Sequence, residues 1–204
     1  MKMIKVFNLN DLTLEQKKAY IAANSEKFDA PDSWYEYTCD SVKEALEKIG
    51  FYNVVTSFSG FWSQGDGAQF TGNYSYEKGV LSAIKKEYPQ WAALHTLAKT
   101  LQELEKLDFY SISFNITRCG NYSHEMATSF EFEDSRRSYG WVSDTFESER
   151  ESLYLDACRD FMREFYTDLE NEYNTLISEE NILEDIENEV YDYIEITEKE
   201  LETL

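Results

Sequence analysis

The sequence predicts an α+β protein in which an antiparallel sheet of about four strands, arranged as two hairpins, is packed by helices and followed by long acidic helices. Two segments with strand-forming residues, 54–76 and 108–134, each contain a turn near the middle. Segments whose apolar residues recur at helical spacing flank both of them. Strands joined by turns pair antiparallel, and helices cover one face of such a sheet.

The first predicted elements are a short strand and two helices. Residues 3–9 alternate weakly between apolar and polar side chains, which is typical of a strand. Thr13 followed by Gln16 is a capping-box pattern, and it predicts a helix that begins there. A second helix is expected to start at Pro31–Asp32 and to end just before Gly50.

Residues 58–72, FSGFWSQGDGAQFTG, contain four glycines in an otherwise highly charged protein. Gly65, Asp66 and Gly67 favour a turn, and the residues on both sides have strand propensity. We therefore predict that this segment is the centre of the first hairpin. Glycine inside a strand allows close approach of another backbone or of a ligand.

Two helices, 80–88 and 90–106, are predicted on either side of Pro89. They lead to the second hairpin. Residues 109–117 alternate between large apolar and small polar side chains, and residues 125–134 alternate again after the turn sequence GNYSH. This regular alternation predicts strands with one buried and one solvated face.

A long helix is predicted from about Ser148 to Leu176, and Ser178 is placed to cap a further helix. The tail from Tyr191 either extends that second helix or adds an edge strand. The long helix has a single apolar stripe, which is expected to be buried. Its members are Tyr154, Cys158, Phe161, Phe165, Leu169, Tyr173 and Leu176.

The formal net charge of −21 is distributed unevenly along the chain. Residues 1–143 hold 19 acidic and 15 basic residues, whereas residues 144–204 hold 21 acidic and 4 basic residues. We therefore divide the chain into an α+β core, 1–143, and an acidic helical region, 144–204, packed on that core. Such a negative field repels nucleic acids and anionic membranes and attracts basic proteins. No apolar run approaches the ~18 residues that a membrane span requires.

Carboxylates recur at a spacing of four along the predicted long helix. Like charges at this spacing destabilise a helix by ~0.2–0.5 kcal/mol per pair. The concentration of acidic residues in one region, and the tyrosines interleaved with them, favour a role in binding, because tyrosine is enriched at protein interfaces. The alternative is a solvated face that keeps the protein soluble. On the first interpretation they bind lysines and arginines of a basic partner, through Asp156, Asp160, Glu164, Asp168, Glu172, Glu184, Asp185 and Glu189.

The tips of the two hairpins are a second candidate site. If both turns meet at one edge of the sheet, Asp66 and His124 form an acid–base pair or part of a small-ligand site. Alternatively, Asp66 caps backbone amides of a tight turn, with His124 hydrogen-bonded below it. The predicted polar cluster comprises Ser63, Gln64, Asp66, Arg118, His124 and Glu125.

Common cofactor and catalytic motifs are missing from the sequence. It has two histidines and three widely spaced cysteines, and it lacks HExxH, P-loop and GxGxxG patterns. Ser63 lacks the preceding glycine of a nucleophile elbow. We therefore predict no metal, no cofactor and no catalytic residue, and we interpret Cys39, Cys119 and Cys158 as buried small residues in a reducing compartment.

The segment FSGFWSQGDG, followed about fifty residues later by GNYSHE, resembles a family of phage and prophage proteins that are often labelled antitoxin-like. The resemblance covers roughly residues 30–180, and the first element is the more specific. Because no apolar run could span a membrane, we expect the protein in the cytoplasm of a bacterial host. The resemblance implies an origin in a mobile element. It implies no mechanism.

These observations lead to three functional hypotheses. The first is a phage-encoded inhibitor of a bacterial defence system, of anti-CRISPR or anti-restriction type, that mimics nucleic acid in a basic protein channel. The second is an antitoxin or small-ligand sponge that uses the hairpin tips. The third is a hydrolase-like enzyme acting through Asp66 and His124. We expect a binding protein rather than an enzyme, with a nucleic-acid-binding defence effector as its basic partner and no direct contact with nucleic acid or membrane.

Overall fold

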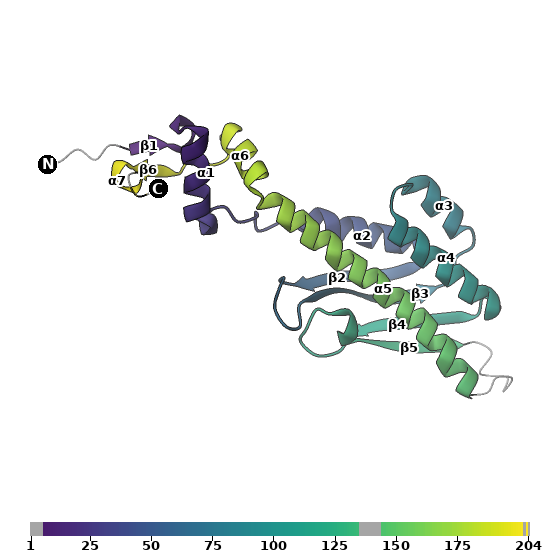
Figure 1. Ribbon diagram of the computed structural model, residues 1–204. Helices are drawn as coiled ribbons and strands as arrows, with labels where there is room; N and C mark the ends of the chain where they lie inside the picture. Colours follow the sequence, from purple (N-terminus) through teal and green to yellow (C-terminus); the bar gives the residue numbers. More distant parts are fainter. Residues whose placement is uncertain (1–5, 135–143, 202, 204) are drawn as a thin grey trace. The chain divides into compact units, whose positions relative to one another are not determined.

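The computed structural model describes residues 6–134, 144–201 and 203. The predicted α+β class is confirmed, because helices pack with antiparallel sheets (Figure 1). The chain forms two compact units, one of residues 1–34 and 171–204 and the other of residues 35–170. We call them the terminal unit and the central unit. The predicted division at residue 143 rests on charge rather than on contacts, and it stays a prediction.

The central unit contains a four-stranded antiparallel sheet, and both predicted hairpins are confirmed. The strands follow the order β2-β3-β4-β5, so each strand lies beside its neighbour in the sequence. A seven-residue loop joins the first two strands, longer than the turn expected at Gly65–Gly67. The strands are β2 (Phe51–Ser59), β3 (Gly67–Ser75), β4 (Ile112–Arg118) and β5 (Thr128–Asp134).

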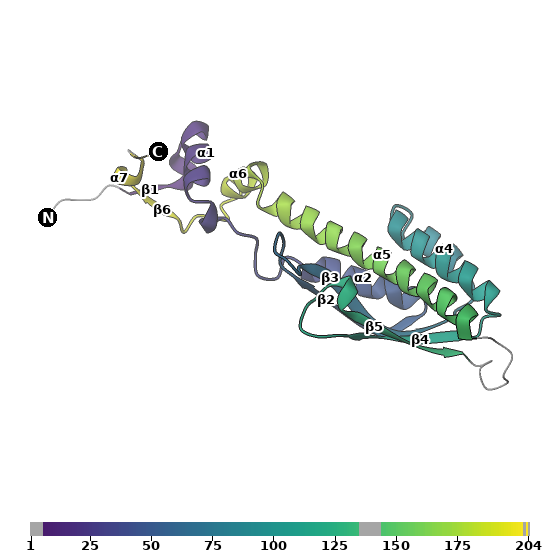
Figure 2. The same ribbon diagram turned by 60° about the horizontal axis from the view of Figure 1, so that its bottom comes forward.

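Helices of the central unit lie on one face of this sheet (Figure 2). In β4, Ile112, Phe114 and Ile116 are buried beneath them, while the alternate serine, asparagine and threonine side chains are half-buried. Phe114 contacts Tyr154, with ring centroids 5.8 Å apart. The helices are α2 (Glu36–Ile49), α3 (Val80–Glu87), α4 (Ala92–Leu107) and the part of α5 (Asp144–Leu176) that precedes residue 171.

The predicted start of α2 at Pro31–Asp32 is wrong. The Pro31 carbonyl accepts a hydrogen bond from Trp34 N–H at 3.0 Å, so a turn precedes the helix, which begins at Glu36. The predicted end is confirmed, because Gly50 has a left-handed φ of 110° directly after Ile49. A Cβ at Gly50 would lie 2.4 Å from the Ser75 carbonyl oxygen, so only glycine fits there.

The terminal unit joins the two ends of the chain around its own hydrophobic core. The Thr13–Gln16 capping box and the Ser178 cap are both confirmed. The tail forms an edge strand, β6, which pairs antiparallel with β1. The elements are β1 (Val6–Asn8), η1 (Leu9–Asp11), α1 (Leu14–Ala23), η2 (Ser25–Lys27), α6 (Glu179–Glu187), β6 (Glu195–Thr197) and α7 (Glu198–Leu201).

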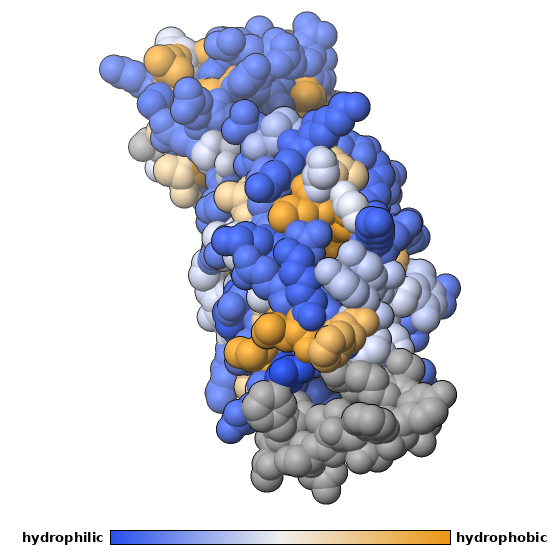
Figure 3. All heavy atoms as spheres, turned by 90° about the vertical axis from the view of Figure 1, so that its right-hand side faces the viewer, coloured by the Kyte–Doolittle hydropathy of each residue, from blue (hydrophilic) through white to orange (hydrophobic). Residues whose placement is uncertain are grey.

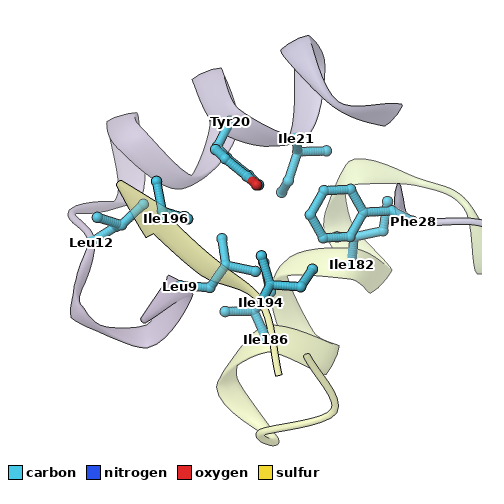
Figure 4. Close-up of a cluster of buried hydrophobic side chains, with 9 residues drawn as sticks. All are labelled: Leu9, Leu12, Tyr20, Ile21, Phe28, Ile182, Ile186, Ile194 and Ile196. Carbon is cyan, nitrogen blue, oxygen red and sulfur yellow. The ribbon is translucent and has the colours of Figure 1, made fainter. Parts of the chain in front are cut away.

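Figure 4 shows how closely the two chain ends are combined in that core. Side chains from residues 9–28 interdigitate with isoleucines from α6, from β6 and from the position just before β6. This packing explains why short elements at opposite ends of the sequence are stable together, since a strand of three residues buries too little surface alone. The core consists of Leu9, Leu12, Tyr20, Ile21, Phe28, Ile182, Ile186, Ile194 and Ile196.

The cysteine prediction is correct in part. Cys158 is fully buried on α5, but Cys39 is half-buried and Cys119 is exposed after β4. Cys119 lies in the segment between β4 and β5, where the chain leaves the sheet. No described helix is long and apolar enough to cross a membrane.

Candidate functional site

Four carboxylates that we call the acidic row, Asp156, Asp160, Glu164 and Asp168, lie along the exposed side of α5, beside its buried stripe. Tyr154, Cys158, Phe161, Phe165 and Leu169 are buried as predicted. Tyr173 and Leu176 are half-buried. Within the central unit, α5 therefore has a buried side and an exposed acidic side. Four of the eight predicted partner-binding residues come together on this acidic side. The exposed carboxylates are Asp156, Asp160, Glu164 and Asp168.

The row is only partly neutralised. Arg163 forms an ion pair with Asp160, and its Nη1 also lies 3.4 Å from Oε1 of Glu125. Although the Asp168 side chain is exposed as a whole, partial burial of its carboxyl group, and next the charge of Glu164, raise its pKa above the ordinary value of 3.8. Both effects disfavour the ionised form, so folding places Asp168 where its charge costs free energy.

The other four predicted residues belong to the terminal unit. Glu172 is half-buried near the end of α5, and Glu184 is exposed on α6. Asp185 accepts a hydrogen bond from the Asn181 side-chain amide at 3.2 Å. Glu189 is exposed just after α6, with a left-handed φ of 64°. The predicted set is thus divided equally between the two units.

A groove between α4 and α5 was not foreseen. It lies in the central unit, has a volume of about 930 Å³, and includes Asp156, Asp160 and Glu164 of the acidic row. The sequence signal for it was a set of small residues on one side of α4, next to the leucine stripe. The lining from α4 consists of Ala92, Ala93, Thr96, Leu97, Thr100, Glu103, Leu104 and Leu107.

The loop of the first hairpin is stabilised from within. Oδ2 of Asp66 accepts a hydrogen bond from Ser63 N–H at 2.7 Å, and Asp66 N–H donates to the Ser63 carbonyl at 3.1 Å. The Asp66 carboxylate also lies close to Gly60, where a Cβ would be 3.4 Å from Oδ2. These contacts are those of a turn cap, which was one of the two interpretations of Asp66.

The two hairpin tips do meet, through glycines rather than through the predicted polar cluster. A Cβ at Gly65 would lie 3.1 Å from the ring of Tyr122, and one at Gly67 would lie 2.9 Å from Cδ2 of His124. Arg118 donates to the Asn121 carbonyl within its own turn. Among the described residues, no hydrogen bond joins Asp66 to His124.

The histidine is held by its neighbours in sequence. Nδ1 of His124 accepts a hydrogen bond from Met126 N–H at 3.0 Å, which requires this nitrogen to be unprotonated. Oε2 of Glu125 lies 2.9 Å from the same nitrogen and would pair with it only in the protonated ring. Glu125 in turn contacts Arg163 of α5. His124 therefore fixes the short 3-10 helix η3 (Glu125–Ala127) at the end of the sheet.

Gln64 and Ser63 lie in the loop between β2 and β3, which also carries the exposed side chain of Trp62. Tyr122, across from this loop, is exposed as well. The hairpin tips thus present aromatic surface beside their polar groups. Within residues 6–134, 144–201 and 203, no three His, Cys, Asp or Glu side chains are arranged to hold a metal ion.

Comparison with known proteins bears on the family alone. Residues 34–179 match the family described as a domain of unknown function (DUF8835). This range includes the four-stranded sheet, both hairpin tips, the groove and the acidic row of α5. No curated protein and no solved structure matches the chain. Because the match covers more than half of the sequence, the chain belongs to the DUF8835 family.

Proposed function

We propose that this protein binds and inhibits a basic, nucleic-acid-binding protein by presenting the carboxylates of α5 in place of phosphates. The observation that carries the proposal is the row of exposed carboxylates along α5, formed by Asp156, Asp160, Glu164 and Asp168. The row belongs to a region of 61 residues with 21 acidic and 4 basic side chains.

The spacing of the row supports this proposal. Residues four apart on a helix are separated by about 6 Å along its axis. Every second phosphate of one DNA strand is separated by about 7 Å along the duplex axis. A cleft whose lysines and arginines are spaced for a phosphate backbone therefore meets carboxylates at a similar interval, and can bind them through charge-assisted hydrogen bonds.

The free-energy cost of the row points the same way. The raised pKa of Asp168 and the repulsion between carboxylates four residues apart both oppose folding at neutral pH. A face needed only for solubility would gain the same net charge from dispersed residues without that repulsion. We infer that the row is retained for binding.

The resemblance of FSGFWSQGDG and GNYSHE to phage and prophage proteins narrows the proposed partner. A protein from a mobile element benefits from blocking a host nuclease that would degrade incoming DNA. We propose a CRISPR effector or a restriction enzyme of the bacterial cytoplasm as the target class.

The test is a plating assay. A bacterial strain with an active restriction or CRISPR system expresses the protein, and the plating efficiency of a targeted phage is measured. The wild-type protein should raise plating, and the variant Asp160→Asn, Glu164→Gln, Asp168→Asn should lose this protection. A matched control removes three exposed carboxylates elsewhere, by Glu47→Gln, Glu131→Gln and Glu133→Gln.

The effector that this protein captures from the same strain should be released by salt, because screening weakens contacts between exposed charges. This protein should also compete with labelled DNA for the captured effector. The proposal fails if the triple variant of α5 folds normally and protects as well as the wild type, or if the control variant loses protection equally.

A second candidate function is supported by one observation, the meeting of the two hairpin tips with Trp62 and Tyr122 exposed beside them. On this alternative the protein is an antitoxin or ligand-binding protein that uses that end of the sheet. The variant Asp66→Ala with His124→Ala tests it. Loss of biological activity with the α5 row intact would transfer the functional site to the hairpins.

A further inference from the structure

We propose that the groove between α4 and α5 binds a basic amphipathic helix of the partner protein. This inference rests on the proposed function, since three residues of the acidic row form one wall of the groove, and it adds what kind of segment the partner supplies.

The floor of the groove is apolar. Leu97, Leu104 and Phe161 lie at its base, and Leu107 and Leu153 lie at one end with 57% and 50% of their surfaces exposed. The molecular surface in Figure 3 likewise shows hydrophobic areas within a mainly hydrophilic face. Exposed leucines beside a concave surface are typical of a site that is covered by a partner.

Small side chains leave the space open. Ala93, Thr96 and Thr100 of α4 face Ala157 of α5 across the groove, where larger residues would fill the gap between the helices. The lining residues of α4 extend from Ala92 to Leu107. At ~1.5 Å per residue this corresponds to about 22 Å, the length of four helical turns.

The walls are acidic. Glu103 lies on the side of α4, and Asp156, Asp160 and Glu164 lie on the side of α5. Among the described residues that line the groove, Arg163 is the one basic side chain, and it is already paired with Asp160 and Glu125. Apolar contacts below and carboxylates along the rim match a helix with leucine-like residues on one face and lysines or arginines beside them.

The same charge disfavours the other occupants. Nucleic acids and anionic lipid surfaces are repelled by the rim. A second copy of this chain carries a net charge of −21 and would place its own acidic helices against these walls. A basic amphipathic helix satisfies both the floor and the rim.

The experiment measures fluorescence anisotropy of a labelled peptide of about 14 residues, with leucine at i, i+3, i+4 and i+7 spacing and lysine elsewhere. A second peptide of the same composition, with its leucines scrambled, keeps the charge and lacks the apolar face. Thr96→Trp fills the groove from an exposed, uncharged position. Ser82→Trp places the same side chain at an exposed position of α3 outside the groove.

We expect the full-length protein to bind the amphipathic peptide at least tenfold more tightly than the scrambled one. Thr96→Trp should weaken binding at least tenfold, and Ser82→Trp should leave it unchanged. Circular dichroism checks that both variants fold.

Equal binding of the two peptides, or normal binding by Thr96→Trp, would overturn the groove proposal and leave the proposed inhibition by the acidic row intact. The same holds if sedimentation shows a dimer that Thr96→Trp dissociates, because a second copy would then cover the groove. Loss of phage protection in the α5 triple variant tests the proposed function separately. Failure of the two proposals is therefore distinguishable.

Discussion

The imidazole ring of His124 lies directly against Gly67, and this contact holds the tips of the two hairpins together. A Cβ at position 67 would be 2.9 Å from Cδ2 and 3.0 Å from Cα of His124. The neighbouring Gln69 is fully buried, with its side-chain amide within hydrogen-bond distance of the His124 and Ala127 carbonyls. The glycine-rich segment is therefore a packing surface for the chain between β4 and β5.

Gly67→Ala should destabilise the protein by about 1–3 kcal/mol, because the added methyl group overlaps both the ring and the backbone of His124. Urea denaturation gives the free energy of unfolding. In a His124→Ala background the ring is gone, so the same substitution should cost less. Simple additivity of the two changes would show that the ring contact does not restrict position 67.

Tyr154→Phe should lower the free energy of unfolding by about 2 kcal/mol, because the tyrosine hydroxyl donates to a buried carboxylate, Oδ2 of Asp108, at 3.1 Å. The phenyl ring keeps its contact with Phe114. Tyr166→Phe is the matched control. Its hydroxyl donates to the Gly60 carbonyl at 3.3 Å in an exposed setting and should matter less. Similar losses in both variants would contradict this ranking.

The sheet was predictable because its signals are local. Period-two alternation in β4 and β5 and turn residues in the first loop are visible within a few residues, and strands adjacent in sequence became neighbours in the sheet. Caps at Thr13, Gly50 and Ser178 were equally local.

What escaped prediction depends on contacts between distant segments. The pairing of β1 with β6 joins Val6 to Thr197, and neither three-residue strand has a strong signal of its own. The start of α2 was misplaced because Pro31 favours both a first helical turn and a simple turn. The groove could not be predicted because it depends on α4 lying beside α5. The apolar stripe of a helix shows which side is buried, but it does not show which helix lies next to it. In the same way, the sequence left two roles open for Asp66, a turn cap or a catalytic acid. The hydrogen bond from Ser63 N–H to its carboxylate identifies the turn cap.

Stability should fall as the pH rises above about 9. Burial raises the pKa of the Cys158 thiol above its ordinary value of 9.0, so the unfolded chain loses this proton at a pH where the folded chain keeps it. The unfolded state then binds fewer protons, and the free energy of unfolding decreases by at most ~1.4 kcal/mol per pH unit for one group. Burial raises the pKa of Tyr74 and Tyr154 as well, which adds the same trend above pH 10.

Cys158→Ala isolates the contribution of the thiol. Urea denaturation between pH 9 and 10 should show a shallower pH dependence for this variant than for the wild type. Cys119→Ala is the control, because Cys119 is exposed. An unchanged slope in Cys158→Ala would mean that the thiol does not titrate differently in the folded and unfolded states.

Asp168→Asn should stabilise the fold while weakening the proposed interaction. At neutral pH the substitution removes a carboxylate whose pKa is raised by burial and by Glu164, and it relieves repulsion of ~0.2–0.5 kcal/mol per pair on α5. Because the folded-state pKa lies above 3.8, the cost of the charge appears as the pH rises through that pKa and is absent in acid. Thermal unfolding should therefore show a higher melting temperature for the variant than for the wild type at pH 7 but not at pH 3.

Glu131→Gln, which changes an exposed carboxylate of β5, is the control and should change neither stability nor phage protection. A gain in stability with reduced protection is the combination expected of residues retained for binding at a cost to folding. A loss of stability at pH 7 would instead show that Asp168 supports the fold, and would remove it from the proposed binding row.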